Sequence, residues 1–287
     1  MDPQPLDRQA LFAALLFQME AGADECIGAE PVDRFAAAAA AREAAAARAD
    51  ARAPAPAPKP AAPAVLSPRQ PAETDAAEAV TEARRLAAGA RTLEELRTAI
   101  EGFEGCALKQ GARNTVFADG DPAARVMFVG EAPGRDEDRE GKPFVGRSGQ
   151  LLDRMLAAIG LDRRAAGPER GAYITNLLPW RPAGDRDPAS DEAAMLLAFL
   201  ERHIELAAPE IVVTLGRAPA SALFDESVSI TRVRGRWRQA ARTGGRPVLP
   251  TLHPAYLLRQ PAEKAKAWRD LLSLRSVLDG APPPEAR

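Results

Sequence analysis

Three side chains with the chemistry of a reactive site stand at or just after the ends of apolar runs that are typical of buried strands. Glu131, Asn176 and His253 are far apart in the sequence, yet each stands at the end of such a run. A carboxylate can position or activate water, and an amide presents a donor beside an acceptor. An imidazole donor can stabilise negative charge that develops on a substrate oxygen. The donor and acceptor of Asn176 could satisfy the N–H and C=O edge of a nucleobase or of a peptide-like ligand.

Each of these residues also has an ordinary structural role. The Glu131 carboxylate could accept backbone N–H groups of its own Gly-rich turn, and Asn176 could cap a strand-to-loop turn. Phe144, between Pro143 and Gly146 in the same loop region, offers either a stacking platform for a planar ring or an anchor of the loop in the core. The sequence leaves both interpretations open for each residue.

Metal chemistry is not favoured by the pattern. The acidic run at 136–140 has no supporting His and no fixed ligand spacing, and is typical of a solvated loop. Cys26 and Cys106 are the only cysteines, too few for a disulfide framework or a metal knuckle. His203, the other of the two histidines, is expected to be a surface or packing residue.

The elements that would position these residues alternate between strands and helices. Strands are predicted at 126–129, 173–177, 211–215 and 248–252, and helices at 92–102, 149–159, 190–206, 218–224 and 263–278. This alternation predicts an α/β fold, a three-layer α/β/α sandwich around a central, mostly parallel four-stranded sheet. Ligands of such sheets bind at the carboxyl ends of the strands, so the three side chains should converge on one edge.

The first third of the chain has a different composition. Residues 1–35 contain an amphipathic helix at 6–22, expected to dock on its own protein or on a protein partner. Residues 36–84 are rich in Ala and Pro and predict a flexible linker before a folded domain at 85–280. No apolar run is long enough to span a membrane and no secretory signal is apparent, so a soluble cytoplasmic protein is expected. The protein is also expected to be a monomer.

Basic residues are distributed unevenly. The chain has 38 Lys and Arg against 40 Asp and Glu, but its N-terminal third is acidic and the remainder mildly basic. Arginines concentrate around Trp237 at positions Arg232, Arg234, Arg236, Arg238, Arg242 and Arg246. This cluster is interpreted either as a surface that contacts phosphates or as a solvated hairpin.

Four separated motifs together resemble the uracil-DNA glycosylase superfamily, and family 4 within it. They are GEAPG at 130–134, EDREGKPFVGRSGQLLD from Glu137, YITN at 173–176 and HPAYLLR at 253–259. The resemblance covers roughly residues 90–277. It implies a DNA repair enzyme that flips uracil out of DNA and hydrolyses its N-glycosidic bond, giving free uracil and an abasic site in base-excision repair.

The resemblance also implies roles for single residues. Glu131 would serve the hydrolytic water, and His253 would steady the departing uracil anion at O2. Gly130, Phe144 and Asn176 would form the uracil pocket, with Phe144 stacked on the base and Asn176 reading its Watson–Crick edge.

On the DNA side, the resemblance places Leu257 or Leu258 in the duplex as a wedge and Arg259 on the backbone, and Arg234 is a further candidate contact from the arginine cluster. A second hypothesis is a non-catalytic DNA-binding or repair-complex module with a retained uracil pocket. A nucleotide-binding protein is disfavoured because neither GxGxxG nor GxxxxGK occurs.

Two departures from the family pattern matter. The family 4 enzymes that this chain resembles use four cysteines to hold an iron–sulfur cluster. The positions that match those cysteines here are Phe103, Cys106, Trp180 and Leu196. Because such a cluster normally needs four thiolates, no cluster is expected. Relatives that attach covalently to DNA have a reactive His after the Asn motif, whereas residues 177–196 contain none, which favours ordinary turnover.

Overall fold

Four parallel strands form the centre of the molecule. The computed structural model describes residues 73–183 and 189–284, and the strand order of its sheet is β1-β3-β2-β4-β6-β5. The parallel strands are β2 (Val126–Gly130), β3 (Tyr173–Asn176), β4 (Ile211–Leu215) and β6 (Pro247–Thr251). They correspond to the four strands predicted from the sequence.

Two short antiparallel strands extend the sheet at its edges. β1 (Ala118–Gly120) pairs with β3, and β5 (Arg238–Gln239) pairs with β6. The sheet in the described part of the chain is therefore six-stranded, and the predicted number of four is wrong. These edge strands are partly exposed and lack the apolar run that identifies a buried strand, so periodicity could not find them.

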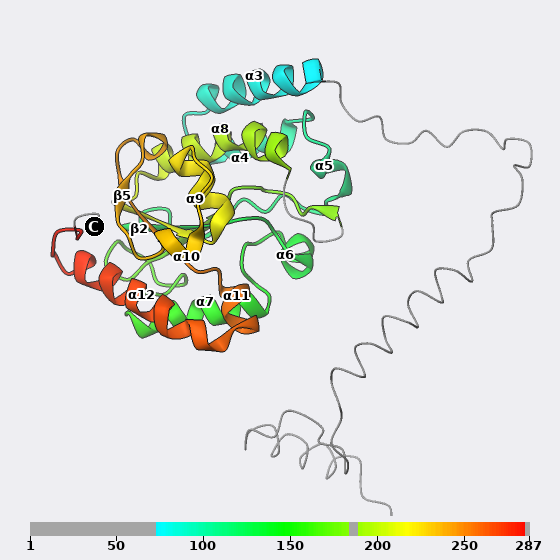
Figure 1. The fold of residues 1–287 in the computed structure, drawn as a ribbon. Coiled ribbons are helices and arrows are strands. Elements are labelled where there is room, and N and C mark those ends of the chain that lie inside the picture. Colours follow the sequence, from blue (N-terminus) through cyan, green and yellow to red (C-terminus); the bar gives the residue numbers. More distant parts are fainter. Residues whose placement is uncertain (1–72, 184–188, 285–287) are drawn as a thin grey trace, which may run out of the picture. The chain divides into compact units, whose positions relative to one another are not determined.

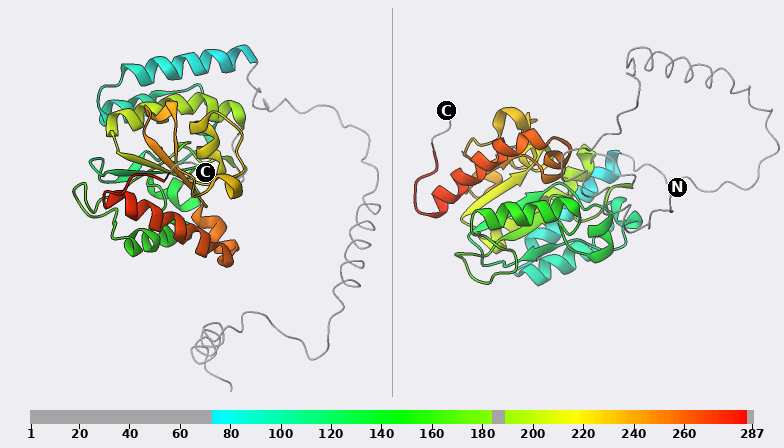
Figure 2. Two further views of the ribbon diagram at one scale, coloured as in Figure 1. Left: turned by 60° about the vertical axis from the view of Figure 1, so that its left-hand side comes forward. Right: turned by 90° about the horizontal axis from the view of Figure 1, so that it is seen from below.

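Helices cover both faces of the sheet, which confirms the three-layer sandwich (Figures 1 and 2). One layer contains α3 (Glu73–Gly89), α4 (Leu93–Gly102) and α8 (Ser190–Ala207), and the other contains α7 (Arg147–Ala158) and α12 (Lys264–Leu278). Shorter elements are α5 (Leu108–Gly111), α6 (Arg135–Glu140), α9 (Arg217–Phe224), α10 (Ile230–Val233), η2 (Ala241–Thr243), α11 (Pro254–Arg259) and η3 (Pro261–Glu263).

The central strand β2 explains why the sequence shows a continuous apolar run. All of its residues are buried, because successive side chains point to opposite faces and both faces are covered. Met127 and Val129 pack into the core that includes α3, α4 and α8. Val126 and Phe128 pack into the core formed with α7 and α12.

The N-terminal boundary of the folded part differs from the expected one. α3 begins at Glu73, so it overlaps the end of the segment 36–84 that was expected to be a linker. Ala83 and Ala87 are buried in the core shared with α8, which makes α3 part of the folded domain. The predicted helix at 6–22 lies outside the described residues. No helix in the described ranges is long and apolar enough to cross a membrane.

Strand order fixes where the sheet can bind a ligand. The chain places β3 on one side of β2 and β4 on the other. The order therefore reverses between β2 and β4, and the crevice at the carboxyl ends of these strands is the favoured ligand site of an open α/β sheet.

Candidate active site

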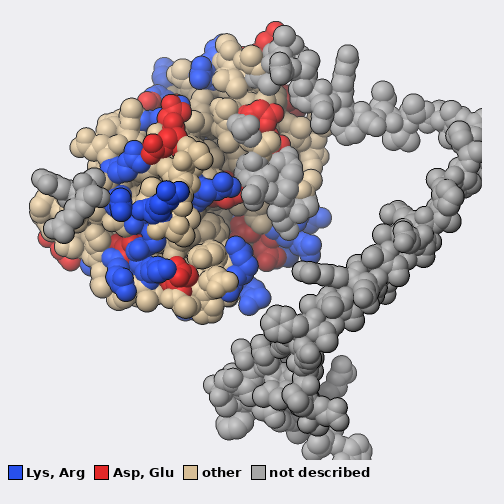
Figure 3. All heavy atoms as spheres, viewed as in Figure 1, with Lys and Arg blue, Asp and Glu red and all other residues tan. Residues whose placement is uncertain are grey.

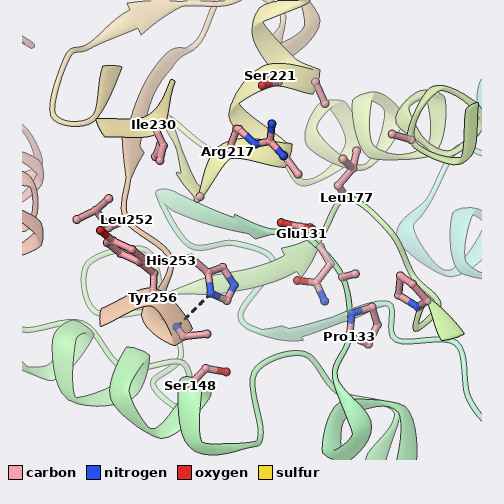
Figure 4. A pocket seen from close by; sticks show the side chains of 18 of the residues that line it. Glu131, Pro133, Ser148, Leu177, Arg217, Ser221, Ile230, Leu252, His253 and Tyr256 are labelled. Atoms are coloured by element: carbon pink, nitrogen blue, oxygen red, sulfur yellow. Dashed lines mark hydrogen bonds between the residues drawn. The ribbon is translucent and has the colours of Figure 1, made fainter. Parts of the chain in front are cut away.

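A pocket of about 1120 Å³ opens at the carboxyl ends of the parallel strands (Figure 4). Glu131 follows β2, Asn176 ends β3, Gly216 follows β4 and His253 follows soon after β6, and all four residues line this pocket. The side chains that the sequence singled out are therefore brought to one place by the sheet, although up to about 120 residues separate them.

Gly130 packs closely against Asn176 and Phe144. It pairs in register with Asn176 across β2 and β3. A Cβ at Gly130 would lie 2.3 Å from Asn176 Oδ1 and 2.6 Å from the Phe144 ring. The absence of a side chain at this position is therefore what lets the amide and the aromatic ring both lie against the β2 backbone.

Asn176 presents an acceptor that the protein leaves unused. The residue is only 7% exposed, and its Oδ1 is buried with no hydrogen-bond partner among the described residues. A buried unsatisfied acceptor costs about 1–3 kcal/mol. Such an atom in the wall of a pocket is expected of a group that binds a donor of the ligand, such as the N–H of a nucleobase.

Phe144 both anchors its loop and faces the pocket. It is buried, packs with the core on the α7 and α12 side, and lines the pocket. Its ring centroid lies 5.5 Å from that of His253, with 34° between the planes. Its φ of 54° is in the left-handed region, which costs a residue with a Cβ about 1–2 kcal/mol.

His253 is held as a neutral hydrogen-bond donor. It is the N-cap of α11, and its Nδ1 accepts the backbone N–H of Ala255 at 3.1 Å. The proton of the neutral ring is therefore on Nε2. Burial, and then the positive charge of Arg259, lower the pKa of His253 to about 4. At neutral pH the site thus contains an uncharged imidazole with one N–H to donate.

Glu131 also lines the pocket, and Figure 4 shows its side chain directed into the cavity. Its backbone carbonyl accepts the N–H of Leu178 at 3.0 Å, and the carbonyl of Gly130 accepts that of Leu177 at 2.9 Å. These bonds fix the segment that follows β2 against the segment that follows β3.

Glu137 is a site residue that the sequence interpretation missed. The acidic run was expected to be a solvated loop, but it forms α6 and Glu137 is only 7% exposed. Its carboxylate accepts the backbone N–H groups of Gly134 at 3.1 Å, Val145 at 3.0 Å and Gly146 at 2.9 Å. A Glu three residues after the helix N-cap at Gly134 is the available signal, since this is where the acid of a capping box stands.

The candidate wedge residues differ in exposure. Leu257 is 1% exposed and packs with Leu151, Leu252 and Ala267. Leu258 is half-buried, and Arg259 is exposed and lines the pocket. Of the two leucines, only Leu258 has surface available for a ligand in this conformation.

Arg234 is bonded within the protein and does not extend from the surface. Its guanidinium donates from Nε to Asp270 Oδ2 at 2.9 Å, pairs through Nη2 with Asp270 Oδ1, and also bonds the carbonyl of Lys266 at 2.6 Å. Asp270 also accepts the Thr251 hydroxyl at 2.7 Å. Burial raises the pKa of Asp270, although both partners stabilise its charged form.

Much of the arginine cluster is likewise paired within the protein. Arg238 pairs with Glu226, and Arg242 pairs with Glu201 and Asp225. Arg232 and Arg236 are exposed. The cluster as a whole is therefore not a continuous phosphate-binding surface.

A basic face nevertheless exists beside the pocket. Figure 3 shows Lys and Arg side chains gathered over α10, α11 and the start of α12. The exposed basic residues of these elements and their connections are Arg232, Arg236, Arg259, Lys264, Lys266 and Arg269. Residues of α10 and α11 also line the pocket, so this face adjoins its mouth.

The four residues that the sequence resemblance placed at the cluster-ligand positions are packed in the interior. Phe103, Cys106, Trp180 and Leu196 are all buried in one core. Phe103 contacts Phe199 edge-on at 5.5 Å. In the described ranges no group of three or more His, Cys, Asp or Glu side chains is arranged to hold a metal ion. With one cysteine and three apolar side chains, these residues do not fit an iron–sulfur cluster.

His203 is confirmed as a packing residue. It is buried, its Nε2 hydrogen-bonds the Tyr173 hydroxyl at 2.8 Å, and its ring stacks on Phe117 at 4.4 Å. Burial lowers the pKa of His203 to about 3.

Comparison with known proteins agrees with this geometry. The family model described as "Uracil DNA glycosylase superfamily" matches residues 117–272. The chain is 37% identical over 194 residues to a type-4 uracil-DNA glycosylase of Sulfurisphaera tokodaii, covering 65% of this chain and 84% of that protein. It is 39% identical over 175 residues to one of Archaeoglobus fulgidus, covering 59% and 85%. One of Thermotoga maritima is 36% identical over 178 residues, covering 61% and 87%. The chain belongs to the uracil-DNA glycosylase superfamily.

Proposed function

We propose that this chain is a uracil-DNA glycosylase, which hydrolyses the N-glycosidic bond of uracil in DNA and leaves free uracil and an abasic site for base-excision repair. The observation that carries the proposal is the pocket in which Asn176, Phe144, Glu131 and His253 meet at the strand ends. The names of the relatives support the same substrate and reaction.

Recognition of the base follows from the pocket walls. The unused Oδ1 of Asn176 would accept the N3–H of a uracil flipped out of the duplex, and the side-chain NH₂ would donate to O4. The Phe144 ring would stack on the base, a contact worth about 1–3 kcal/mol. Gly130 leaves room for this arrangement. Extrusion of the base costs a few kcal/mol and is easiest for a mismatched pair, such as U opposite G.

Bond cleavage needs stabilisation of two developing charges. As the N-glycosidic bond breaks, negative charge develops on uracil and positive charge on the sugar. The Nε2–H of neutral His253 would donate to uracil O2 and stabilise the anion. Glu131 would orient the water that attacks C1′. The water supplies the hydroxyl group that is added to C1′ of the sugar. Its remaining proton neutralises the uracil anion, so the products are the abasic site and neutral uracil.

DNA would bind across the basic face beside the pocket. Arg259 and the exposed Arg232 and Arg236 are the proposed phosphate contacts. Leu258 is the proposed wedge because Leu257 is already buried in the core. Arg234 is not proposed as a DNA contact, since its guanidinium is bonded to Asp270.

We also propose that the enzyme works without an iron–sulfur cluster. The buried Phe103, Trp180 and Leu196 support this, because they replace thiolate ligands with apolar packing. Purified protein should contain no stoichiometric iron by elemental analysis, and Cys106→Ala should retain uracil excision. Iron at four atoms per chain, lost together with activity in Cys106→Ala, would contradict the proposal.

The function is tested with a labelled oligonucleotide that contains a single uracil, treated with alkali to cleave abasic sites. Wild type should give strand breaks, and Asn176→Ala and His253→Ala should each lower the single-turnover rate by about 10²-fold or more. Binding of the oligonucleotide without breaks above a protein-free control would favour a non-catalytic module. Equal rates in wild type and both variants would refute the site assignment. Gel filtration of the same protein checks the expected monomer.

A further inference from the structure

The loop that presents Phe144 is bonded on both sides by buried charged residues. On the C-terminal side, one oxygen of Glu137 accepts the N–H groups of Val145 at 3.0 Å and Gly146 at 2.9 Å. On the N-terminal side, Arg163 Nη1 donates to the carbonyl of Pro143 at 2.9 Å. The peptide groups on both sides of Phe144 are therefore held by hydrogen bonds. Phe144 is also the one non-glycine residue of this loop with a positive φ.

Both charged residues are themselves tied to the frame of the site. The second oxygen of Glu137 accepts the N–H of Gly134, which connects the turn after β2 to the Phe144 loop. Arg163 is bonded from Nε to Asp153 on α7 at 2.7 Å and pairs with Asp119 on β1 at 3.3 Å. Its side chain is 6% exposed. Neither side chain can move without breaking three hydrogen bonds.

The Phe144 backbone is also confined by α7. A Cβ at Gly149 would lie 1.7 Å from the Phe144 carbonyl oxygen, so the helix begins directly against this carbonyl. With the carbonyl of Pro143 held by Arg163 and the N–H of Val145 held by Glu137, the left-handed conformation of Phe144 is determined from both sides.

We propose that Glu137 and Arg163 are positioning residues for base recognition, which hold the Phe144 ring in the pocket wall beside His253 through the peptide groups on either side of it. This inference rests on the proposed function, because it takes the ring to be the stacking surface for the flipped base. Both residues act through Phe144, so their loss should matter only while the ring is present.

The chemistry of Glu137 suggests a sharp substitution. All three of its partners are backbone N–H donors, so both oxygens must accept. Glu137→Gln preserves size but turns one acceptor into an NH₂ group that faces a donor. Arg163→Lys keeps the charge but cannot bond Asp153 and the Pro143 carbonyl in the same geometry. It serves as a second variant from the other side of the loop.

A double-mutant cycle with Phe144→Ala tests the proposal. Glu137→Gln should lower kcat/KM for uracil excision about 10- to 100-fold in the wild-type background, because a small misplacement of a substrate-positioning group has effects of this size. In the Phe144→Ala background the same change should cost less than about threefold. Equal losses in both backgrounds would mean a general structural role and would overturn the proposal.

Asp121→Asn is the matched control. Asp121 is another carboxylate that accepts two backbone N–H groups, from Ala123 at 2.9 Å and Gly167 at 2.5 Å, but it does not line the pocket. It should leave kcat/KM unchanged, which the proposal requires. A loss equal to that of Glu137→Gln would show that any such carboxylate supports activity and would overturn it.

A crystal structure of Glu137→Gln, or of Arg163→Lys if the first variant does not fold, separates this proposal from the proposed function. A Phe144 φ that becomes negative, with the ring displaced from His253, is the expected result whatever reaction the pocket performs. A φ still near 54° with the ring in place would overturn the positioning role. Absence of uracil excision by wild type would overturn the proposed function instead.

Discussion

At the scale of single residues, the protonation state of His253 connects local structure to the proposed reaction. The Nδ1 atom caps α11 by accepting the Ala255 N–H, and burial disfavours the charged ring. The same environment therefore selects both the tautomer and the neutral form. In the proposed reaction this neutral donor would stabilise the uracil anion by a hydrogen bond, and it is present throughout the physiological pH range.

The pH dependence of uracil excision should reflect this lowered pKa. His253 stays neutral as pH falls from 8 to about 5. Protonation of His253 should therefore lower the single-turnover rate only near pH 4. Rates of wild type and His253→Asn are compared across this range. The acid limb should be present in wild type and absent from the variant. A wild-type limb centred near pH 6.5 that the variant lacks would contradict a buried neutral imidazole.

Gly130 gives a second prediction at this scale. Gly130→Ala would place a methyl group 2.3 Å from Asn176 Oδ1 and 2.6 Å from the Phe144 ring. Moving these groups should lower uracil excision by about 10²-fold, whereas the free energy of unfolding should fall by only about 1–3 kcal/mol. Excision kinetics and urea unfolding measure the two effects.

Gly102→Ala is the control for Gly130→Ala, because a Cβ there meets nothing within 4 Å. It should behave like wild type in both assays. Normal excision by Gly130→Ala would mean that the close packing of Asn176 and Phe144 against Gly130 is not needed for recognition of the base.

At the scale of elements, the buried Arg234–Asp270 pair connects α12 to the segment between α10 and β5. Asp270 on α12 also accepts the hydroxyl of Thr251, the last residue of β6, two positions before His253. The side chain of Asp270 is 2% exposed and that of Arg234 is 16% exposed. This pair therefore supports the strand end from which His253 reaches the pocket.

Arg234→Ala should destabilise the fold by about 3–5 kcal/mol, because it leaves a buried carboxylate without its charged partner. Arg236→Ala, two residues away and exposed, should change stability by less than about 0.5 kcal/mol. Urea unfolding distinguishes them. For DNA affinity we expect the opposite ranking, with the larger effect from Arg236→Ala. This variant should lower the slope of log affinity against log salt by about one, the loss of one phosphate contact. A stable Arg234→Ala with weakened DNA binding would restore Arg234 as a DNA contact.

The elements also show what sequence patterns could and could not predict. Parallel strands buried on both faces produce continuous apolar runs, so β2, β3, β4 and β6 and their carboxyl-end residues were predictable. Edge strands β1 and β5 were not, because partial exposure removes the apolar signal. The roles of Glu137 and Arg234 depend on contacts 8 to 36 positions away in the sequence. Residue type alone predicted a solvated position for Glu137 and a DNA contact for Arg234.

At the scale of the whole molecule, both histidines are uncharged in the folded state, which makes stability depend on pH. In the unfolded chain an imidazole binds a proton near pH 6.5, but folded His203 remains neutral down to a pKa of about 3. The unfolded state therefore takes up protons first as pH falls, and stability is lost progressively below about 6.5.

For His203 this loss should reach about 2 kcal/mol between pH 7 and pH 5. His203→Gln keeps a polar group for the Tyr173 hydroxyl but does not titrate. Urea unfolding at the two pH values should show a smaller decrease for the variant than for wild type. Equal decreases would mean that His203 is not the source of the pH dependence.

Every role proposed for a residue of the pocket depends on the identity of the reaction. Its most direct test is the quantity of free uracil released from a duplex with one U·G pair, with the same duplex containing T·G as the control. We expect more than one equivalent of uracil per enzyme molecule, an equal quantity of abasic sites, and no thymine. Release of no uracil above the protein-free control, from folded protein that binds the duplex, would contradict the account.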